Sequence, residues 1–147
     1  MKLTEHFELS EFTRSATADK LHIDNTIPEE LIPNLKNLCE QVLEPLREHF
    51  GISVVISSGY RCPQLNKAVG GVPNSQHQKG EAADIIPPYT INHTPYTLKQ
   101  WFYWLLDNTH FDQLGYEQSG STKWIHVSCK LDASKNRRQV LRITKRV

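Results

Sequence analysis

Hydrophobic and polar positions repeat with two different periods along the chain, and each period predicts a different kind of element. Between residues 31 and 50 apolar side chains recur every three or four positions, which predicts a long helix with one buried side. Thr26 is the predicted N-cap of this helix, and Gly51 is placed to end it. Pro33 and Pro45 interrupt the pattern, so we expect kinks or turn boundaries at both.

After this helix the period falls to two, which is typical of strands. Residues 52–57 alternate in this way, and a short helix is predicted over residues 63–69. A capping box at residues 97–100 predicts the start of another helix, after a loop at residues 87–96. Further short strands are predicted at residues 82–86, 111–116, 124–129 and 140–143. A small antiparallel sheet flanked by helices places the chain in the α+β class.

The length of the chain predicts a single domain. It has 147 residues, and one domain per about 150 residues is usual. Residues 1–25 are mixed and polar with short helical patches, whereas residues 26–147 carry the regular patterns. We interpret the first segment as an N-terminal flap that packs on the core through Leu9, Phe12 and Leu21.

The charge balance and the cysteines exclude several classes of protein. Lys and Arg number 17 against 16 Asp and Glu, so the surface as a whole is not built to bind nucleic acid or an anionic membrane. We therefore expect no nucleic-acid partner and no membrane association. We also expect a monomer. Three cysteines without a CxxC pair argue against a disulfide framework and against a thiolate zinc site. The charged N-terminal residues contain no apolar run, so we expect cytoplasmic synthesis without a signal peptide.

The C-terminal segment departs from this balance. No acidic residue follows Asp132, and the segment is rich in basic residues. One interpretation is a solvated edge strand that is protected by positive charge. The other is an electrostatic contact with an anionic polymer. The basic residues are Lys135, Arg137, Arg138, Arg142, Lys145 and Arg146.

Two histidines and one aspartate form the most informative constellation. His77 and Asp84 lie seven residues apart, and a glycine turn between them can bring both side chains to one point. His126 lies on a predicted strand, where it shares a face with Trp124 and Ser128. Two imidazoles and a carboxylate are the donor set of a catalytic zinc site with an open fourth position for water. Such a site lowers the pKa of the water to about 7 and supplies hydroxide near neutral pH.

The wider motifs, taken in order along the chain, resemble a known family. They are S-S-G-Y-R at residues 57–61, L-N at 65–66, V-G-G at 69–71, S-x-H-x-x-G-x-A-x-D at 75–84 and W-I-H-V-S at 124–128. Together they closely resemble the zinc D-Ala-D-Ala carboxypeptidase family of peptidoglycan peptidases, in particular its endolysin-like branch. The resemblance covers nearly the whole chain. It implies a single zinc peptidase domain with the α+β fold that this family shares with the hedgehog signalling domain.

By this resemblance His77, Asp84 and His126 are the ligands of one Zn²⁺ ion, which their donor atoms also allow. The resemblance places Arg61 over the site, in contact with the substrate. A planar guanidinium holds a carboxylate or a polarised carbonyl oxygen through two hydrogen bonds, and it stabilises the charge that develops during hydrolysis. The alternative for Arg61 is a surface ion pair with Glu81 or another acid.

A hydrolase of this kind needs a general base, and the resemblance suggests Glu117. Many relatives carry an acid two or three residues before the last histidine ligand, where this chain has Trp124 and Lys123. In the branch that the chain resembles most, a glutamate ends the preceding strand. Glu117 takes that place in Q-L-G-Y-E at residues 113–117, although Gly115 stands where the branch has an apolar residue.

Several of these assignments keep an alternative. Asp112 and Glu81 are further candidates for the base, and Glu117 has the alternative of a solvent-facing acid at the end of a strand. Ser75 is predicted to donate a hydrogen bond to the substrate or to Asp84, with an ordinary turn residue as the alternative.

The function implied by the resemblance is hydrolysis of stem-peptide bonds in peptidoglycan by a zinc-dependent peptidase. Carboxypeptidase and endopeptidase action both fit, and so does a phage or prophage endolysin that acts on the cell wall after release from the cytoplasm. One alternative is a non-catalytic zinc-binding module like the hedgehog relatives, because no acid directly precedes His126. Another is nucleic-acid binding through the basic C-terminal segment.

Overall fold

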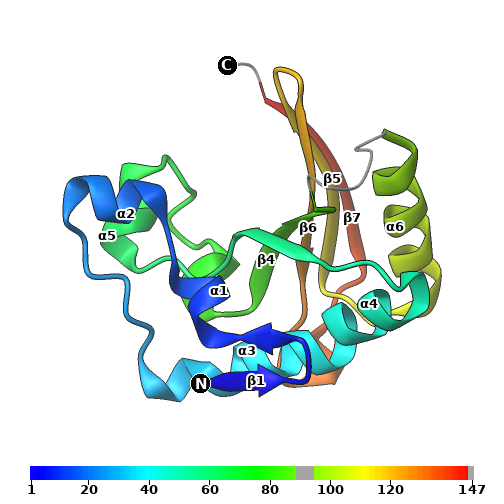
Figure 1. Ribbon diagram of the computed structural model, residues 1–147, viewed down its shortest axis with the longest axis horizontal. Helices are drawn as coiled ribbons and strands as arrows, with labels where there is room; N and C mark the ends of the chain where they lie inside the picture. The colour runs from blue at the N-terminus through cyan, green and yellow to red at the C-terminus, as the bar shows by residue number, and fades with distance from the viewer. Residues whose placement is uncertain (89–94, 146–147) are drawn as a thin grey trace.

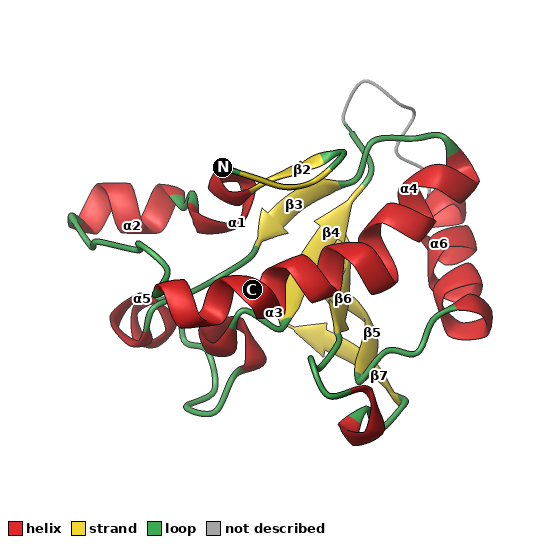
Figure 2. Cartoon of the chain, turned by 90° about the horizontal axis from the view of Figure 1, so that it is seen from below, coloured by secondary structure: helices red, strands yellow, loops and turns green. Residues whose placement is uncertain are grey.

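A five-stranded sheet forms the centre of the molecule, in a computed structural model that describes residues 1–88 and 95–145 (Figure 1). The strand order across the sheet is β3-β4-β6-β5-β7. Helices cover one face of the sheet, so the predicted α+β architecture is confirmed (Figure 2). The strands are β3 (Val55–Ser58), β4 (Ala82–Ile86), β5 (Gln113–Ser119), β6 (Thr122–Ser128) and β7 (Gln139–Lys145).

Strand pairing is antiparallel, as predicted, except at one edge of the sheet. The pairs β3–β4, β4–β6 and β5–β6 are antiparallel, whereas β7 runs parallel to β5. The parallel edge arises because the chain after β6 passes through a short 3₁₀ helix, η4 (Ala133–Lys135), and returns to the end where β5 begins. There the Gln139 N–H donates to the Asp112 carbonyl oxygen over 2.8 Å, which starts β7 beside the first residue of β5.

One helical segment runs from Glu29 to Phe50 in four consecutive parts. They are η1 (Glu29–Leu31), α3 (Ile32–Leu38), the π-helical turn η2 (Cys39–Leu43) and α4 (Glu44–Phe50). The π turn precedes Pro45, whose missing N–H leaves the carbonyl four residues back without its α-helical donor. The helix widens there, and the Glu44 N–H donates to the carbonyl oxygen five residues back, that of Cys39. Pro45 therefore marks a boundary, as its position in the sequence predicts.

Two predicted helix starts are wrong. Thr26 does not cap the long segment, because its N–H and hydroxyl both donate to Asp24 Oδ1, over 3.0 and 2.6 Å, and hold it in a separate turn. Helix α6 (Pro95–Asn108) begins two residues before Thr97, so Thr97 lies inside the first turn. Proline is favoured at the first helical position, where its missing N–H costs nothing. Residues 89–94 of the predicted loop lie outside the described part of the chain.

The N-terminal segment packs on the core through aromatic side chains. Phe12 is completely buried, and its carbonyl oxygen accepts a 2.7 Å hydrogen bond from the Tyr60 N–H. Leu9 packs at the edge of the core, but Leu21 is 51% exposed, so its predicted contact with the core is wrong. The division into flap and core stays a prediction. The segment contains β1 (Lys2–Thr4), β2 (Phe7–Glu8), α1 (Leu9–Thr13) and α2 (Ala16–Leu21).

The two faces of the sheet differ in chemistry. Ala83, Ile85 and Val127 are buried against the helices, together with Leu114 and Ile125. Because successive side chains point to opposite faces, the residues between them lie on the other face, where the polar site is built. Among the described residues, no helix has the length and hydrophobicity to cross a membrane.

Candidate metal centre

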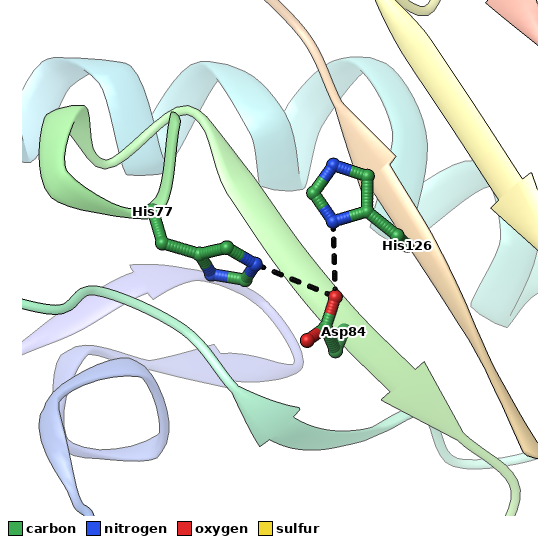
Figure 3. A group of neighbouring side chains, drawn as sticks. All are labelled: His77, Asp84 and His126. Atoms are coloured by element: carbon green, nitrogen blue, oxygen red, sulfur yellow. Dashed lines mark hydrogen bonds and ion pairs between the residues drawn. The ribbon is translucent and has the colours of Figure 1, made fainter. Parts of the chain in front are cut away.

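His77, Asp84 and His126 come together from three elements on the open face of the sheet (Figure 3). Asp84 lies on β4 and His126 on β6, and strand pairing sets these two residues directly opposite each other. His77 lies on the 3₁₀ helix η3 (Gln76–Lys79), which leads into β4. One ligand atom from each residue lies within 4.8 Å of the other two. The seven-residue spacing therefore spans one helical turn and the start of a strand.

The turn that carries His77 is built by its neighbours. Ser75 is the N-cap of η3, and its Oγ accepts a hydrogen bond from the His77 N–H over 3.2 Å. Gly80 ends η3 at φ 70°, a left-handed conformation that glycine adopts without strain. The Arg61 N–H donates to the His77 carbonyl oxygen over 3.0 Å, which ties η3 to the chain after β3.

Hydrogen bonds orient both imidazole rings. His77 Nδ1 lies 2.7 Å from the Gly59 carbonyl oxygen, which can only accept, so Nδ1 carries the proton and Nε2 keeps its lone pair. His77 Nε2 lies 3.4 Å from Asp84 Oδ1, and His126 Nδ1 lies 3.0 Å from the same oxygen. The nitrogen and oxygen donors that zinc accepts thus face a common point.

The electrostatics of this cluster match those of a cation site. Burial raises the pKa of Asp84, but the two histidines outweigh this effect and lower its pKa well below the usual range. Burial lowers the pKa of His126, whereas its hydrogen bond to Asp84 raises it, and the net shift is upward. The cluster thus stabilises positive charge beside a partly buried carboxylate. Two imidazole nitrogens and one carboxylate oxygen suit a divalent metal ion, which would take the place of protons on the histidines.

A pocket of about 480 Å³ opens beside the metal-ligand candidates. Its lining includes the three candidates together with Arg61 and Glu117, so strand pairing and loop geometry bring all the predicted site residues to one place. The Glu117 side chain is only 5% exposed, which contradicts the alternative of a solvent-facing acid. Trp124 Nε1–H donates to Glu117 Oε1 over 3.1 Å.

The position of the Glu117 side chain explains why residue 115 is a glycine. It pairs with His126 across the β5–β6 ladder, and it precedes Glu117 by two residues on the same face of β5. A Cβ atom at residue 115 would lie 3.3 Å from Glu117 Oε2, closer than ordinary van der Waals contact. The glycine therefore leaves room for the Glu117 carboxylate to turn back along the strand.

A comparison with known families agrees with this geometry. The family model for peptidase M15 matches residues 5–128, which is more than four fifths of the chain. The chain belongs to the peptidase M15 family. This M15 peptidase is therefore a hydrolase of the metallopeptidase class, and its substrates are peptides. No curated protein matches the chain.

Among the described residues of the M15 peptidase, Ser75 lacks one of its two predicted contacts, and Arg61 lacks the ion pair with Glu81 that was its alternative. Ser75 makes no hydrogen bond to Asp84 among the described contacts, because its Oγ faces the His77 N–H and lies 3.5 Å from Arg61 Nη2. Its contact with substrate stays a prediction. Arg61 forms no ion pair with Glu81 in the described part of the chain. Burial lowers the pKa of Arg61, and the charges of Asp84 and Glu117 partly offset this effect.

The further candidates for the base, Asp112 and Glu81, do not line the pocket of the M15 peptidase. Asp112 is completely buried and accepts hydrogen bonds from Arg137 and Gln76, so its carboxylate is already engaged. Glu81 does not line the pocket. Arg137 and Gln76 do line it, although no motif singles them out as site residues. The long-range pairing of β7 with β5 brings Arg137 there, and only the folded chain reveals it.

Proposed function

We propose that this M15 peptidase is a zinc-dependent hydrolase of stem-peptide bonds in peptidoglycan. One observation carries the proposal: His77, Asp84 and His126 converge in a pocket that is also lined by an acid, Glu117, and a cation, Arg61. In the proposed site His77, Asp84 and His126 hold one zinc ion. When bound, zinc supplies Lewis acidity, which polarises a carbonyl oxygen and makes water a nucleophile near neutral pH.

Glu117 is the proposed general base and acid. Its carboxylate accepts the proton of the attacking water and delivers it to the leaving amine. The hydrogen bond from Trp124 holds one oxygen of Glu117, and the small Gly115 leaves room for the other. The side chain is thereby oriented before substrate binds, which avoids the cost of ordering it during the reaction.

Arg61 and Ser75 are the proposed contacts to the peptide. The Arg61 guanidinium stabilises the negative charge that develops on the carbonyl oxygen, and its half-buried position strengthens this effect. The Ser75 Oγ accepts a hydrogen bond from the His77 N–H, and its own hydroxyl proton is available for a substrate acceptor.

The proposed substrate class follows from the family and the motifs. Residues 57–84 and 124–128 carry the strings that resemble peptidoglycan peptidases of the endolysin-like branch. We propose that the enzyme is made in the cytoplasm and reaches the cell wall after release. A non-catalytic zinc-binding module is the second candidate function, because Lys123 and Trp124 replace the acid that many relatives have before the last histidine. The burial of Glu117 in the pocket supports the catalytic proposal.

Digestion of purified muropeptides tests this proposal. The zinc-loaded protein is incubated with muropeptides, and the products are identified by mass spectrometry, which also reports the bond that is cut. His77→Ala is expected to lower cleavage by at least about a hundredfold, because removal of one ligand leaves an incomplete site. His110→Ala is the matched control, since His110 is an exposed histidine outside the pocket.

Two results would contradict the proposal. If His77→Ala cleaves muropeptides at the wild-type rate, the proposed mechanism is wrong. If the wild-type protein binds one zinc ion per chain and cleaves no muropeptide, the non-catalytic module is the better account.

A further inference from the structure

One arginine in the wall of the pocket has no part in the proposed chemistry. Arg137 lies between η4 and β7 and lines the same pocket as the metal-ligand candidates. It lies outside residues 5–128, the part of the chain that the peptidase M15 family model matches. Its position therefore does not follow from the motifs that define the metal centre.

Arg137 is held rigidly by a buried carboxylate. Its Nε and Nη2 atoms donate to the two oxygens of Asp112 over 3.0 and 2.8 Å. Its backbone N–H donates to the same carboxylate over 2.9 Å. Asp112 is itself completely buried, and Gln76 Nε2 donates to it over 2.8 Å. The guanidinium plane is therefore oriented before any ligand arrives.

The ion pair uses only part of the guanidinium. Arginine has five side-chain N–H donors, and the two bonds to Asp112 leave the Nη1 group and the second Nη2 hydrogen without a partner among the described contacts. The side chain of Arg137 is 52% exposed, whereas that of Asp112 is 0% exposed. A purely structural ion pair would explain the buried carboxylate. It also orients the guanidinium, whose remaining N–H groups stay at the wall of the pocket, where they can bind a ligand.

The surroundings of Arg137 favour an anionic ligand. The two acids that line the pocket, Asp84 and Glu117, belong to the metal-ligand cluster and the proposed base. The lining residues near the start of β5 and along β7 are neutral, namely Gln113 and Leu141. A planar guanidinium donor is complementary to a carboxylate, which accepts through two oxygens in one plane.

We propose that Arg137 binds a carboxylate of the peptide substrate, with Asp112 as the positioning residue that orients it. This inference rests on the proposed function and adds a specificity contact to it. The enzyme would then distinguish a peptide that carries a free carboxylate at this subsite from the same peptide with a neutral carboxamide. The difference is expected to be about tenfold or more in affinity, which is typical of a hydrogen bond between charged groups.

Matched peptide pairs test the inference. One pair is the stem pentapeptide L-Ala-γ-D-Glu-L-Lys-D-Ala-D-Ala with the α-carboxylate of its D-Glu residue either free or amidated. The other pair has the C-terminal carboxylate free or amidated. Dissociation constants are measured by calorimetry on the wild-type protein with and without zinc, and kcat/KM is measured on the zinc-loaded protein.

The variants separate binding from folding. Arg137→Gln leaves Asp112 buried beside a neutral partner, so the double variant Asp112→Asn/Arg137→Gln is included to remove both charges. Arg137→Lys keeps the charge but lacks the planar fork. Arg142→Gln is the control, because Arg142 is an exposed arginine on β7 that does not line the pocket.

We expect the wild-type protein to prefer the free carboxylate in one pair by about tenfold or more. The preference should disappear in the double variant, decrease in Arg137→Lys and persist in Arg142→Gln. Equal dissociation constants for both pairs in the wild type, or a preference that survives in the double variant, would overturn the inference. If the zinc-loaded protein cleaves no peptide, the proposed function fails, while the dissociation constants still decide whether Arg137 binds a carboxylate.

Discussion

Asp84 and Asp112 are two poorly exposed carboxylates in or beside the pocket, with 16% and 0% of their side chains exposed, and they have very different partners. Both have a pKa that their partners lower against the opposing effect of burial. Asp84 faces two imidazoles, whose neutral form can ligate a metal. Asp112 faces an arginine, which stays charged and cannot ligate one. The comparison shows that the partner decides what a carboxylate of low exposure can do. Beside histidines it can bind a metal ion, whereas beside an arginine it stays in a fixed ion pair.

Replacement of Asp84 or Asp112 by asparagine is expected to give the largest difference, which is in zinc binding. Asp84→Asn replaces the proposed carboxylate ligand of zinc by a neutral amide. We therefore expect zinc affinity to fall more than about a hundredfold and cleavage to disappear. Asp112→Asn is expected to keep one zinc ion per chain, since Asp112 is engaged by Arg137 and Gln76. The zinc content of each variant after dialysis, measured by inductively coupled plasma mass spectrometry, checks both expectations. If Asp112→Asn loses zinc and Asp84→Asn keeps it, Asp112 and not Asp84 is the metal ligand.

The second largest effect is expected on kcat when the proposed base is removed. Glu117→Gln keeps the shape of the side chain and an oxygen for the Trp124 hydrogen bond, but it cannot carry the proton. We expect kcat to fall by about a hundredfold to ten-thousandfold, with zinc content unchanged. Steady-state kinetics on a muropeptide, with metal analysis of the same sample, measure both. A wild-type kcat in Glu117→Gln would rule out Glu117 as the base.

A smaller effect is expected at Gly115. In Gly115→Ala the new Cβ would lie 3.3 Å from Glu117 Oε2, so the carboxylate must shift. We expect kcat to fall by about threefold to tenfold with KM nearly unchanged, because misplacement of a catalytic group mainly affects the chemical step. Ser119→Ala, on the same strand but outside the pocket lining, is the control. If the two variants have equal kcat values, Gly115 does not position Glu117.

The smallest expected effect is on acid stability. Burial raises the pKa of Asp112, but Arg137 and Gln76 outweigh it and lower the pKa to about 2. Because this value lies below the unfolded value of about 4, the stabilisation is complete above about pH 4 and is lost as the pH falls toward 2. The wild type should therefore lose about 1 kcal/mol more of its free energy of unfolding than Asp112→Asn between about pH 6 and pH 3. Urea unfolding at several pH values measures this. Parallel losses in the two proteins would contradict the ion-pair account.

The sequence predicted most elements and the spacing of the site residues, but it misplaced two helix starts and did not predict the parallel edge of the sheet. The spacing of His77, Asp84 and His126 and the position of Pro45 follow from short segments, and the structure brings the three side chains together. The parallel pairing of β7 depends on where the chain returns after η4, which residue patterns do not encode. Arg137 was predicted only as one of several basic residues, because its pocket position depends on that same pairing.

Zinc titration during catalysis tests the central claim most directly. Metal-free protein is titrated with zinc while cleavage of a purified muropeptide is followed, and bound metal is measured in parallel. We predict that cleavage is absent without zinc, rises in proportion to bound zinc and reaches its maximum at one ion per chain. Cleavage in the presence of a strong chelator, or one bound zinc ion per chain without any cleavage, would contradict the account.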